Sequence, residues 1–347
     1  MTGFCTNNAV LRFALLLGLL NAMAAGEKEP FSTRKYFFGE GPEISDISNI
    51  TWAHAVNSIA ELEKALNDDT MMLEADISLG TVHGSEQVVP IMAHPPANTS
   101  DLSFEVFINR IIRAVDGGAK KGAKLDFKDI KTVEPCLQML KQLKRKKKIS
   151  FPVWLNADIL PGPVNSTDEP VNATEFLSLA SEYSPSSMLS LGWKTNFGCH
   201  VRGKYEKSQI LEMIEVVGQF NPQVPPTFPV RAGLAAESVE ELLLLIATVP
   251  GSTLTLWASA SDPVDMNNLQ DLIDTINTKN LYIDLPFDLI DGPGNNCKES
   301  PVVIQNDTNV DNSIVPQDDA VPGGISVNSA MPLLLVALVA LIFGCSF

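Results

Sequence analysis

The chain has 347 residues, of which 45% are hydrophobic and 19% are charged, a composition that excludes an intrinsically disordered or collagen-like protein. Lys and Arg number 25 against 41 Asp and Glu, which gives a net charge of −16. A surface of this sign repels nucleic-acid phosphates, so we expect no nucleic-acid partner. The one basic run, Lys141–Lys148, is interpreted as the solvated end of a helix, with a binding patch as the alternative.

Residues 1–25 have the order of a secretory signal peptide. Arg12 is the only charged residue among them, an apolar run follows over residues 13–20, and small residues then predict cleavage near Ala24 or Ala25. The alternative is an uncleaved membrane anchor, for which this apolar run is short.

Short apolar runs rich in β-forming residues alternate with helical patterns through the middle of the chain. Strands are expected at Ile50–Ala55, Met71–Leu79, Ala123–Phe127, Phe151–Ala157, Met188–Trp193, Thr227–Ala232, Thr253–Ala258 and Leu281–Leu285, with an extra strand at Val88–His94. Helices are expected at Ser58–Leu66, Leu102–Val115, Thr132–Leu143, Ala173–Ala180, Lys207–Gln219, Ser238–Val249 and Met266–Ile276.

This alternation predicts an α/β protein with a single (β/α)8 barrel, or TIM barrel. Eight strands separated by helices in about 240 residues match the size of that fold. Nearly continuous apolar strands, such as the one at Thr253–Ala258, suit a sheet that is buried on both faces. The alternative, an open doubly wound sheet, requires a glycine-rich first turn, and residues 53–57 contain no glycine.

Polar side chains stand at the ends of the predicted strands, where a barrel has its active site. In chain order they are His54, Glu74 and Asp76, His94 in the next loop, Asp126 and Lys128, Asn156 and Asp158, Trp193, Arg231, Trp257, and Asp284. The remaining two histidines of the chain, His83 and His200, are expected in exposed loops.

Glu74, Asp76 and Asp126 are the predicted metal ligands. Glu74 and Asp76 are two residues apart on a strand, so both side chains point to one face, and Asp126 and Lys128 repeat this geometry on the next strand. Three carboxylates at one barrel mouth repel one another unless a hard cation or Lys128 neutralises them. Oxygen-only ligation favours Mg²⁺ or Ca²⁺ over zinc.

The histidines and the remaining polar residues have predicted roles in catalysis and substrate binding. His54 and His94 at the same rim predict a general base and general acid pair, with buried, hydrogen-bonded histidines as the alternative. The predicted substrate-binding residues are Lys128, Asn156, Asp158, Trp193, Arg231, Trp257 and Asp284. Each has a structural alternative: a salt bridge for Lys128, loop hydrogen bonds for the Asn and Asp residues, and barrel filling for the two Trp residues.

Four segments around these residues are long enough to carry a family resemblance: Trp52–Ser58, Met72–Asp76, Pro90–Pro96 and Trp154–Leu160. They resemble the menorin family, also called family with sequence similarity 151, over about residues 36–291. The order of His54, Glu74-x-Asp76, His94 and Asp126-x-Lys128 is also similar to the glycerophosphodiester phosphodiesterase-like superfamily, which includes phospholipase D toxins.

The resemblance implies a phosphodiesterase-type TIM barrel at residues 36–292 with two catalytic histidines and a carboxylate-bound Mg²⁺ or Ca²⁺. It suggests a metal-dependent phosphodiester hydrolase or phospholipase D-like lyase acting on a phosphodiester or phospholipid-like substrate. Two positions depart from the superfamily pattern: Ala55-Val56 replaces Arg-Gly, and Pro95 replaces Asp. The alternative is therefore a catalytically inactive recognition protein or co-receptor that binds extracellular or cell-surface proteins, as in neuronal patterning.

The C-terminal region predicts membrane attachment through a GPI anchor. Residues 293–330 are polar and are expected to form a disordered linker, and residues 331–347 end in an apolar run with no basic flank. The attachment site is expected at Asp318–Ala320 or at Gly323-Gly324. A tail anchor is the alternative, but it would not require an N-terminal signal. The expected location is the extracellular side of the plasma membrane.

Five N-x-S/T sequons agree with a secreted chain: Asn49, Asn98, Asn165, Asn172 and Asn306. Three cysteines remain between the two processed ends, Cys136, Cys199 and Cys297, so one disulfide at most is expected.

Overall fold

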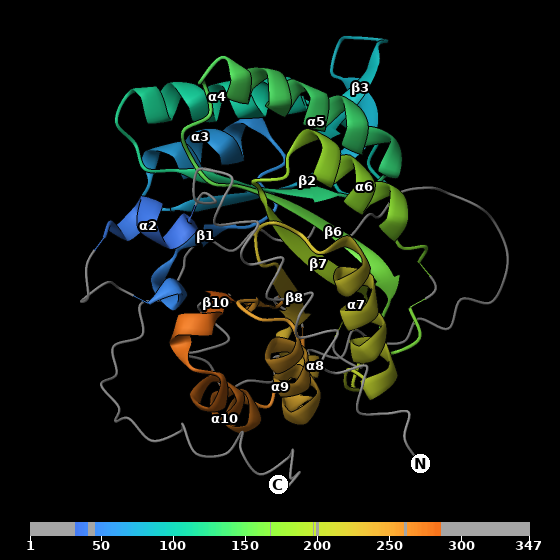
Figure 1. Cartoon of the computed structure of the whole chain (residues 1–347). Helices are drawn as coiled ribbons and strands as arrows, with labels where there is room; N and C mark the ends of the chain where they lie inside the picture. Colours follow the sequence, from blue (N-terminus) through green and yellow to red (C-terminus); the bar gives the residue numbers. More distant parts are fainter. Residues whose placement is uncertain are drawn as a thin grey trace, which may run out of the picture.

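Parallel strands and helices alternate along the chain in the computed structural model (Figure 1). It describes residues 32–40, 46–166, 168–196, 198, 201–259 and 262–285. The predicted signal peptide, the linker at 293–330 and the GPI-attachment segment at 331–347 lie outside the described residues, as do Asn306, Cys199 and Cys297.

Eight parallel strands lie side by side in the order of the sequence, β1-β2-β5-β6-β7-β8-β9-β10. They are β1 Trp52–Ala53, β2 Met72–Val82, β5 Gly122–Phe127, β6 Val153–Pro161, β7 Met188–Lys194, β8 Thr227–Arg231, β9 Thr253–Trp257 and β10 Leu281–Asp284. A doubly wound sheet reverses its strand order at a switch point, and this order never reverses. The barrel prediction is confirmed, and the doubly wound alternative is wrong.

The barrel is nearly closed, and its seam lies between β10 and β1. No strand pairing joins these two among the described residues. The short helix η1, Ile47–Asn49, packs against β10 instead. Two side-chain bonds also cross the seam, from Thr278 Oγ1 to Asp46 Oδ2 at 2.5 Å and between His54 Nδ1 and Asp284 Oδ2 at 3.1 Å. A predicted active-site residue therefore helps to close the barrel.

Seven helices cover the outside of the strands close to their predicted positions. They are α3 Ile59–Asn67, α4 Phe104–Asp116, α5 Ile130–Arg145, α6 Ala173–Tyr183, α7 Lys207–Phe220, α9 Val239–Thr248 and α10 Met266–Ile276. Ser58 and Ser103 cap α3 and α4 by accepting hydrogen bonds from the backbone N–H groups of Glu61 and Val106. Within the described ranges, no helix is long and apolar enough to cross a membrane.

Two short helices have no counterpart in the sequence prediction. Helix α8, Ala232–Ala235, begins directly after β8, so Ala232 belongs to a helix rather than to the expected strand. Helix α2, Thr33–Phe38, begins at the N-cap Ser32 and precedes the first strand. A 3-10 helix, η2 at Thr278–Asn280, leads into β10.

Strand β2 continues beyond the barrel and carries a hairpin. β3, Val88–Met92, pairs with it antiparallel, which agrees with the expected extra strand, and β4, Thr99–Ser100, pairs with it in parallel. Gly80 permits this close packing, because a Cβ at this position would lie 2.2 Å from the carbonyl oxygen of Asn98. The loop after β3 carries His94.

Two separate cores fill the molecule. The larger one lies between the strands and the outer helices, and includes Leu73, Leu125 and Leu155 from three neighbouring strands. The smaller one closes the amino-terminal end of the barrel with Trp52, Trp154, Tyr282 and, from α2, Phe37.

An aromatic plug, defined as Trp52, Trp154 and Tyr282, holds this amino-terminal end together. The ring centroids of Trp52 and Trp154 lie 5.3 Å apart, and those of Trp154 and Tyr282 lie 4.7 Å apart. Trp154 Nε1 also donates to Thr33 Oγ1 at 2.9 Å, which fixes α2 over the plug.

Candidate metal and catalytic site

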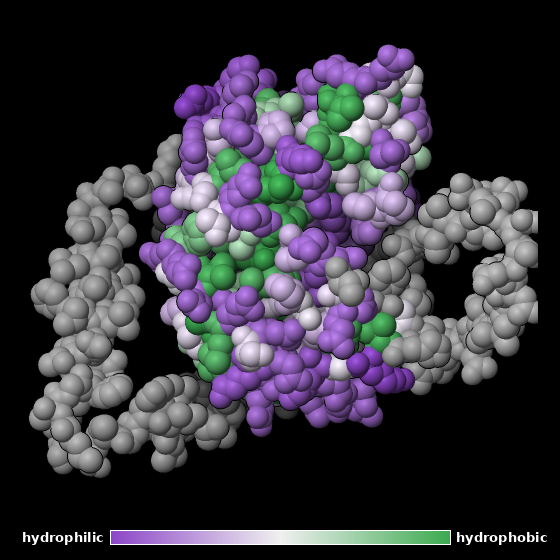
Figure 2. All heavy atoms as spheres, turned by 90° about the vertical axis from the view of Figure 1, so that its right-hand side faces the viewer, coloured by the Kyte–Doolittle hydropathy of each residue, from purple (hydrophilic) through white to green (hydrophobic). Residues whose placement is uncertain are grey.

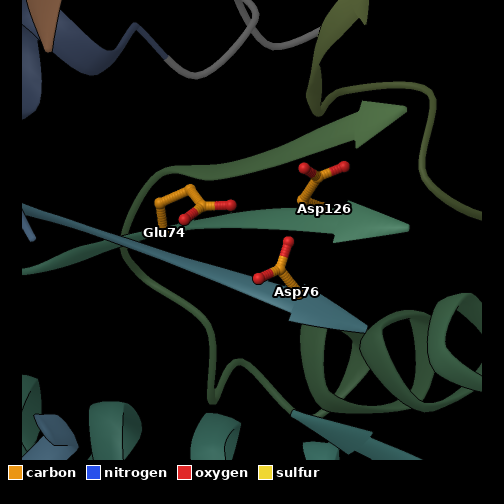
Figure 3. Close-up of side chains that lie close together, drawn as sticks. All are labelled: Glu74, Asp76 and Asp126. Atoms are coloured by element: carbon orange, nitrogen blue, oxygen red, sulfur yellow. The ribbon is translucent and has the colours of Figure 1, made fainter. Parts of the chain in front are cut away.

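Three carboxylates meet at the carboxyl-terminal end of the barrel (Figure 3). Glu74 and Asp76 lie on β2, Asp126 lies on β5, and Asp76 is the register partner of Asp126. All three are buried, and one oxygen of each lies within 4.8 Å of the others. Their shared face follows directly from the two-residue period of a strand. We call these three residues the acidic cluster.

Neighbouring groups hold the acidic cluster in place. Asn57 donates from Nδ2 to Asp76 Oδ2 at 2.8 Å and accepts from the backbone N–H of Asp76 at 3.0 Å. The backbone N–H of Ala55 donates to Glu74 Oε2 at 2.8 Å. Sequence reasoning missed Asn57, and the only signal was its place three residues after His54 in the loop that follows β1.

Lys128 lies between two of the carboxylates. Its Nζ lies 3.0 Å from Asp76 Oδ1 and 2.7 Å from Asp126 Oδ2. Burial opposes the charge on Lys128, but the carboxylates of Asp126 and Asp76 outweigh it and raise the pKa of its ammonium well above the ordinary value. One cation thus offsets part of a charge that comes from three buried acids.

The acids of the cluster differ in how readily they ionise. Burial raises the pKa of Glu74, and the charge of His54 opposes that shift. Burial also disfavours ionised Asp76, but Lys128, His94 and the hydrogen bond from Asn57 outweigh it and lower the pKa of Asp76 to about 2. Asp76 is therefore ionised at neutral pH, whereas burial disfavours the charged form of Glu74.

The acidic cluster fits a hard divalent cation. Asp126 Oδ1 is buried and has no hydrogen-bond partner, which is costly for a carboxylate oxygen. A cation between the three carboxylates would satisfy this oxygen and favour the charged form of Glu74. The donors are all oxygens, the set that Mg²⁺ and Ca²⁺ prefer.

His54 lies beside the acidic cluster. Its Nδ1 is 3.1 Å from Asp284 Oδ2 and 3.8 Å from Glu74 Oε2, and its ring stacks on Trp257 with centroids 6.2 Å apart. Desolvation opposes protonation, but the charges of Glu74 and Asp284 raise the pKa of His54 to about 9. The side chain is 42% exposed, and with Nδ1 directed at the carboxylates, the free ring nitrogen Nε2 points away from them.

His94 is exposed on the loop after β3. Its Nδ1 lies 2.6 Å from the carbonyl oxygen of Pro95, so this nitrogen is occupied by the loop backbone. His94 is close enough to Asp76 for its charge to lower the pKa of that carboxylate. The structure thus brings both predicted catalytic histidines to the end of the barrel that holds the acidic cluster.

Asn156, Asp158 and Asp284 point into the barrel and are engaged with protein groups. Ser190 Oγ donates to Asn156 Oδ1 at 2.5 Å, and Lys194 Nζ lies 3.7 Å from Asp158 Oδ2. Burial raises the pKa of Asp158, and the charge of Asp126 adds to this shift. Asp284 orients His54. These contacts give all three residues a structural role in addition to their predicted role in substrate binding.

Arg231 is neutralised by a carboxylate that sequence reasoning missed. Its Nε and Nη2 donate to the two oxygens of Asp262 at 2.6 and 2.9 Å, and its guanidinium lies 4.5 Å from the ring centroid of Trp257. The ring of Trp257 is therefore a neighbour of both Arg231 and His54. Asp262 gave no sequence signal, because it lies in a loop without a motif.

Trp193 does not line the interior of the barrel, in contrast to the predicted pocket wall. Its ring lies 5.2 Å from Tyr205 and 6.3 Å from Phe228, in the core between the strands and the helices. Gly192, its neighbour on β7, faces Asp158 instead: a Cβ at Gly192 would lie 2.5 Å from Asp158 Oδ1. The register of β7 places its odd-numbered residues, including Trp193, on the outer face of the barrel.

The predicted glycosylation sites are mostly accessible. Asn98, Asn165 and Asn172 are exposed, and Asn49 is partly buried. Asn172 also caps α6 through its Oδ1, which accepts from the backbone N–H of Glu175 at 2.9 Å. Glycosylation stays a prediction. Cys136 is a buried, free cysteine.

Comparisons with known proteins identify relatives over most of the chain. The profile of the Menorin N-terminal domain matches residues 46–290. The human protein named FAM151B is 36% identical over 243 residues, which cover 69% of this chain and 83% of that protein.

Two solved structures have a weaker likeness. The crystal structure of 2,3-dimethylmalate lyase, a member of the PEP mutase/isocitrate lyase superfamily, matches at 8% identity with a TM-score of 0.36 over 68% of this chain and 76% of the other. The structure of S. officinalis PLC21 matches at 9% identity with a TM-score of 0.36 over 72% of this chain and 35% of the other.

Proposed function

This chain belongs to the menorin family, and we propose that it is a metal-dependent phosphodiesterase whose active site is the acidic cluster with His54 and His94. One observation carries the proposal: a buried set of three oxygen ligands lies beside a histidine that a carboxylate orients. Ion pairs that only stabilise the fold do not explain why the buried oxygen Asp126 Oδ1 has no hydrogen-bond partner.

Glu74, Asp76 and Asp126 would hold Mg²⁺ or Ca²⁺, which supplies positive charge to the phosphoryl oxygens of a bound substrate. Lys128, which the ion would displace from Asp126, would then supply a second positive charge that stabilises the negative charge developing on the phosphoryl group. The guanidinium of Arg231 is occupied by Asp262, so phosphate binding depends on Lys128 rather than on Arg231.

The two histidines divide the proton transfers. The carboxylate of Asp284 favours protonated His54, and Nε2 of His54 donates a proton to the oxygen that leaves phosphorus. His94 accepts the proton of the attacking hydroxyl, which is water in a hydrolase or a hydroxyl of the substrate in a lyase. The bond from phosphorus to the leaving oxygen breaks as the new one forms.

The substrate class that we propose is a phosphodiester with an apolar part, such as a phospholipid. Figure 2 shows the molecule from the side toward which the barrel strands run, and hydrophobic residues form a band on this face between polar ones. Membrane attachment through a C-terminal GPI signal and export to the cell surface, both expected from the sequence, would place the site near lipids.

A second function, a recognition protein without catalysis, is favoured by Lys128 itself. Its ammonium already bridges Asp76 and Asp126, so two of the three acids have a partner without any metal. A recognition protein of this kind would bind extracellular or cell-surface proteins. The two functions differ in whether divalent cations displace Lys128 from the cluster.

The deciding experiment measures turnover of the purified protein on a panel of phosphodiesters with Mg²⁺ or Ca²⁺. The proposal predicts turnover that chelation abolishes, and none in His54→Ala or His94→Ala variants that fold normally and still bind the metal. The control is Lys131→Met, which changes an exposed residue of α5. A wild-type protein that cleaves no phosphodiester under these conditions would contradict the enzyme and favour the recognition protein.

A further inference from the structure

A cavity of about 140 Å³ lies at the amino-terminal end of the barrel, away from the acidic cluster. Residues at the starts of β6 and β7 line it, together with Thr33 of α2 and Lys144 near the end of α5. Ile149, Phe151 and Met188 form an apolar part of the wall, and Ser186, Ser187 and Lys144 a polar part. A cavity needs only about 10–15 Å³ of such volume to hold one water, so this one accommodates a larger group.

Lys144 is a largely buried cation without a counter-charge. Its Nζ donates to Ser184 Oγ at 2.8 Å and to Ser187 Oγ at 3.0 Å, and both serines are buried. No carboxylate of the described residues pairs with it, and burial lowers the pKa of Lys144 to about 8. An ammonium has three N–H donors, so one donor is left for a ligand in the cavity.

Lys144 bonds to hydroxyl groups at the end of helix α6 rather than to its carbonyl groups. Lys141, one turn earlier, already donates to the carbonyl oxygen of Glu182 at 3.2 Å and lies 4.7 Å from the ring centroid of Tyr183. These contacts serve the last turn of α6. Lys144 contacts the hydroxyl of Ser184, which is the C-cap residue of α6, and the hydroxyl of Ser187, and it also lines the cavity.

Four more basic residues follow Lys144 directly. Arg145, Lys146, Lys147 and Lys148 are exposed, and they make no ion pair within the described ranges of the chain. The basic run that the sequence indicated is solvated at these four positions, as expected, but its member Lys144 turns inward. These four positive charges contrast with the net charge of −16 of the whole chain.

We propose that this end of the barrel binds a sulfated polysaccharide, with one sulfate group in the cavity on Lys144 and Ser187 and further sulfates along Arg145–Lys148. The sulfate group in the cavity is then the counter-ion of Lys144. A group of neighbouring exposed cations suits a ligand with repeated anionic groups, because each added contact contributes affinity.

The class of polyanion follows from the expected location of the chain. The overall negative charge opposes both kinds of polyanion equally, so location rather than charge decides between nucleic acid and a sulfated polysaccharide. The signal peptide and sequons predict export, and outside the cell sulfated polysaccharides are abundant polyanions. The proposal does not depend on catalysis, since the cavity and the acidic cluster lie at opposite ends of the barrel.

The test is calorimetric titration of the purified protein with a heparin oligosaccharide, and with a hyaluronan oligosaccharide of equal length as an unsulfated polyanion. Wild-type protein should bind heparin at least tenfold more tightly than hyaluronan. Lys144→Met should weaken heparin binding at least tenfold, whereas Lys131→Met, at the exposed opposite end of the same helix, should leave it unchanged.

Two further measurements separate binding from folding. The exposed double variant Lys146→Gln with Lys148→Gln should weaken heparin binding and flatten its dependence on salt. Inorganic sulfate should protect the Lys144 amine, but not that of Lys131, from acetylation in the wild-type protein. Glu74→Gln should bind heparin normally, which separates this proposal from the proposed phosphodiesterase.

Three results would overturn the proposal. The first is equal affinity of the wild-type and Lys144→Met proteins for heparin. The second is equal affinity of the wild-type protein for heparin and hyaluronan. The third is binding to vesicles of anionic phospholipid without binding to heparin, which would assign the basic run to a membrane surface.

Discussion

The two ends of the barrel carry buried charge in opposite ways. At the carboxyl-terminal end, Glu74, Asp76 and Asp126 face each other, and Lys128 offsets part of their charge. At the amino-terminal end, Lys144 stands next to serine hydroxyls with no acid beside it. The first end has too much negative charge and the second has an uncompensated positive charge, so each end fits a ligand of the opposite sign.

The largest expected effect concerns the catalytic role of His54. His54→Ala should lower kcat about 10³-fold, because general acid catalysis contributes about 10²–10⁴-fold. Steady-state turnover on the best phosphodiester of the panel measures this, with Lys131→Met as control. A loss of less than about tenfold would remove His54 from the chemistry.

Removing the cation at the acidic end should destabilise the protein. Lys128→Met leaves Asp76 and Asp126 buried without their partner, and breaking a buried ion pair costs about 3–5 kcal/mol. Denaturant unfolding of the chelated protein measures this cost. Added Mg²⁺ or Ca²⁺ should restore most of the lost stability if the cluster binds the ion, and absence of recovery would favour the recognition protein.

Removing the cation at the amino-terminal end, Lys144, should instead stabilise the protein at neutral pH. The pKa of Lys144 is lowered from 10.5 to about 8, so between these values the unfolded chain binds more protons than the folded one. Burial of the charged ammonium therefore lowers the free energy of unfolding, and this cost is fully present below pH 8. As the pH rises to 10.5 the cost is lost, so the free energy of unfolding increases by roughly 3 kcal/mol, at 1.36 kcal/mol per pKa unit.

Lys144→Met should therefore raise stability near pH 7 and abolish this rise. Unfolding free energies of wild type and variant at several pH values isolate the effect of Lys144, since buried tyrosines titrate in both proteins. A variant less stable than wild type at pH 7 would show that the serine contacts outweigh the burial of the charge.

A smaller effect is expected at Asp284. Asp284→Asn keeps the shape but removes one of the two carboxylates that raise the pKa of His54 from 6.5 to about 9. The pKa of His54, followed by NMR, should fall, and kcat should decline with a shifted pH profile. An unchanged profile would limit Asp284 to closing the barrel seam.

The sequence predicted those parts of the molecule that follow from local periodicity. Eight apolar runs and their helices predicted the barrel, and the two-residue spacing of Glu74 and Asp76 predicted a shared face before any partner was visible. Asp126 joined them because the next strand in the chain is also the neighbouring strand in space.

Features that depend on distant packing were not predictable. Asp262 binds Arg231 from a loop 31 residues away, and Trp193 faces outward because of the register of β7. Lys144 looks like any member of its basic run, and only the packing of α5 against α6 and β7 separates it from its exposed neighbours. Helix α2 is six residues long, too short for a clear period.

The most direct measurement is a crystal structure of the wild-type protein soaked with Mn²⁺, compared with Asp126→Asn, because anomalous scattering locates that ion unambiguously. The account predicts one ion bound by oxygens of Glu74, Asp76 and Asp126, with Lys128 displaced from Asp126, and no ion in the variant. A wild-type cluster that excludes the ion, with Lys128 still bonded to both aspartates, would contradict it.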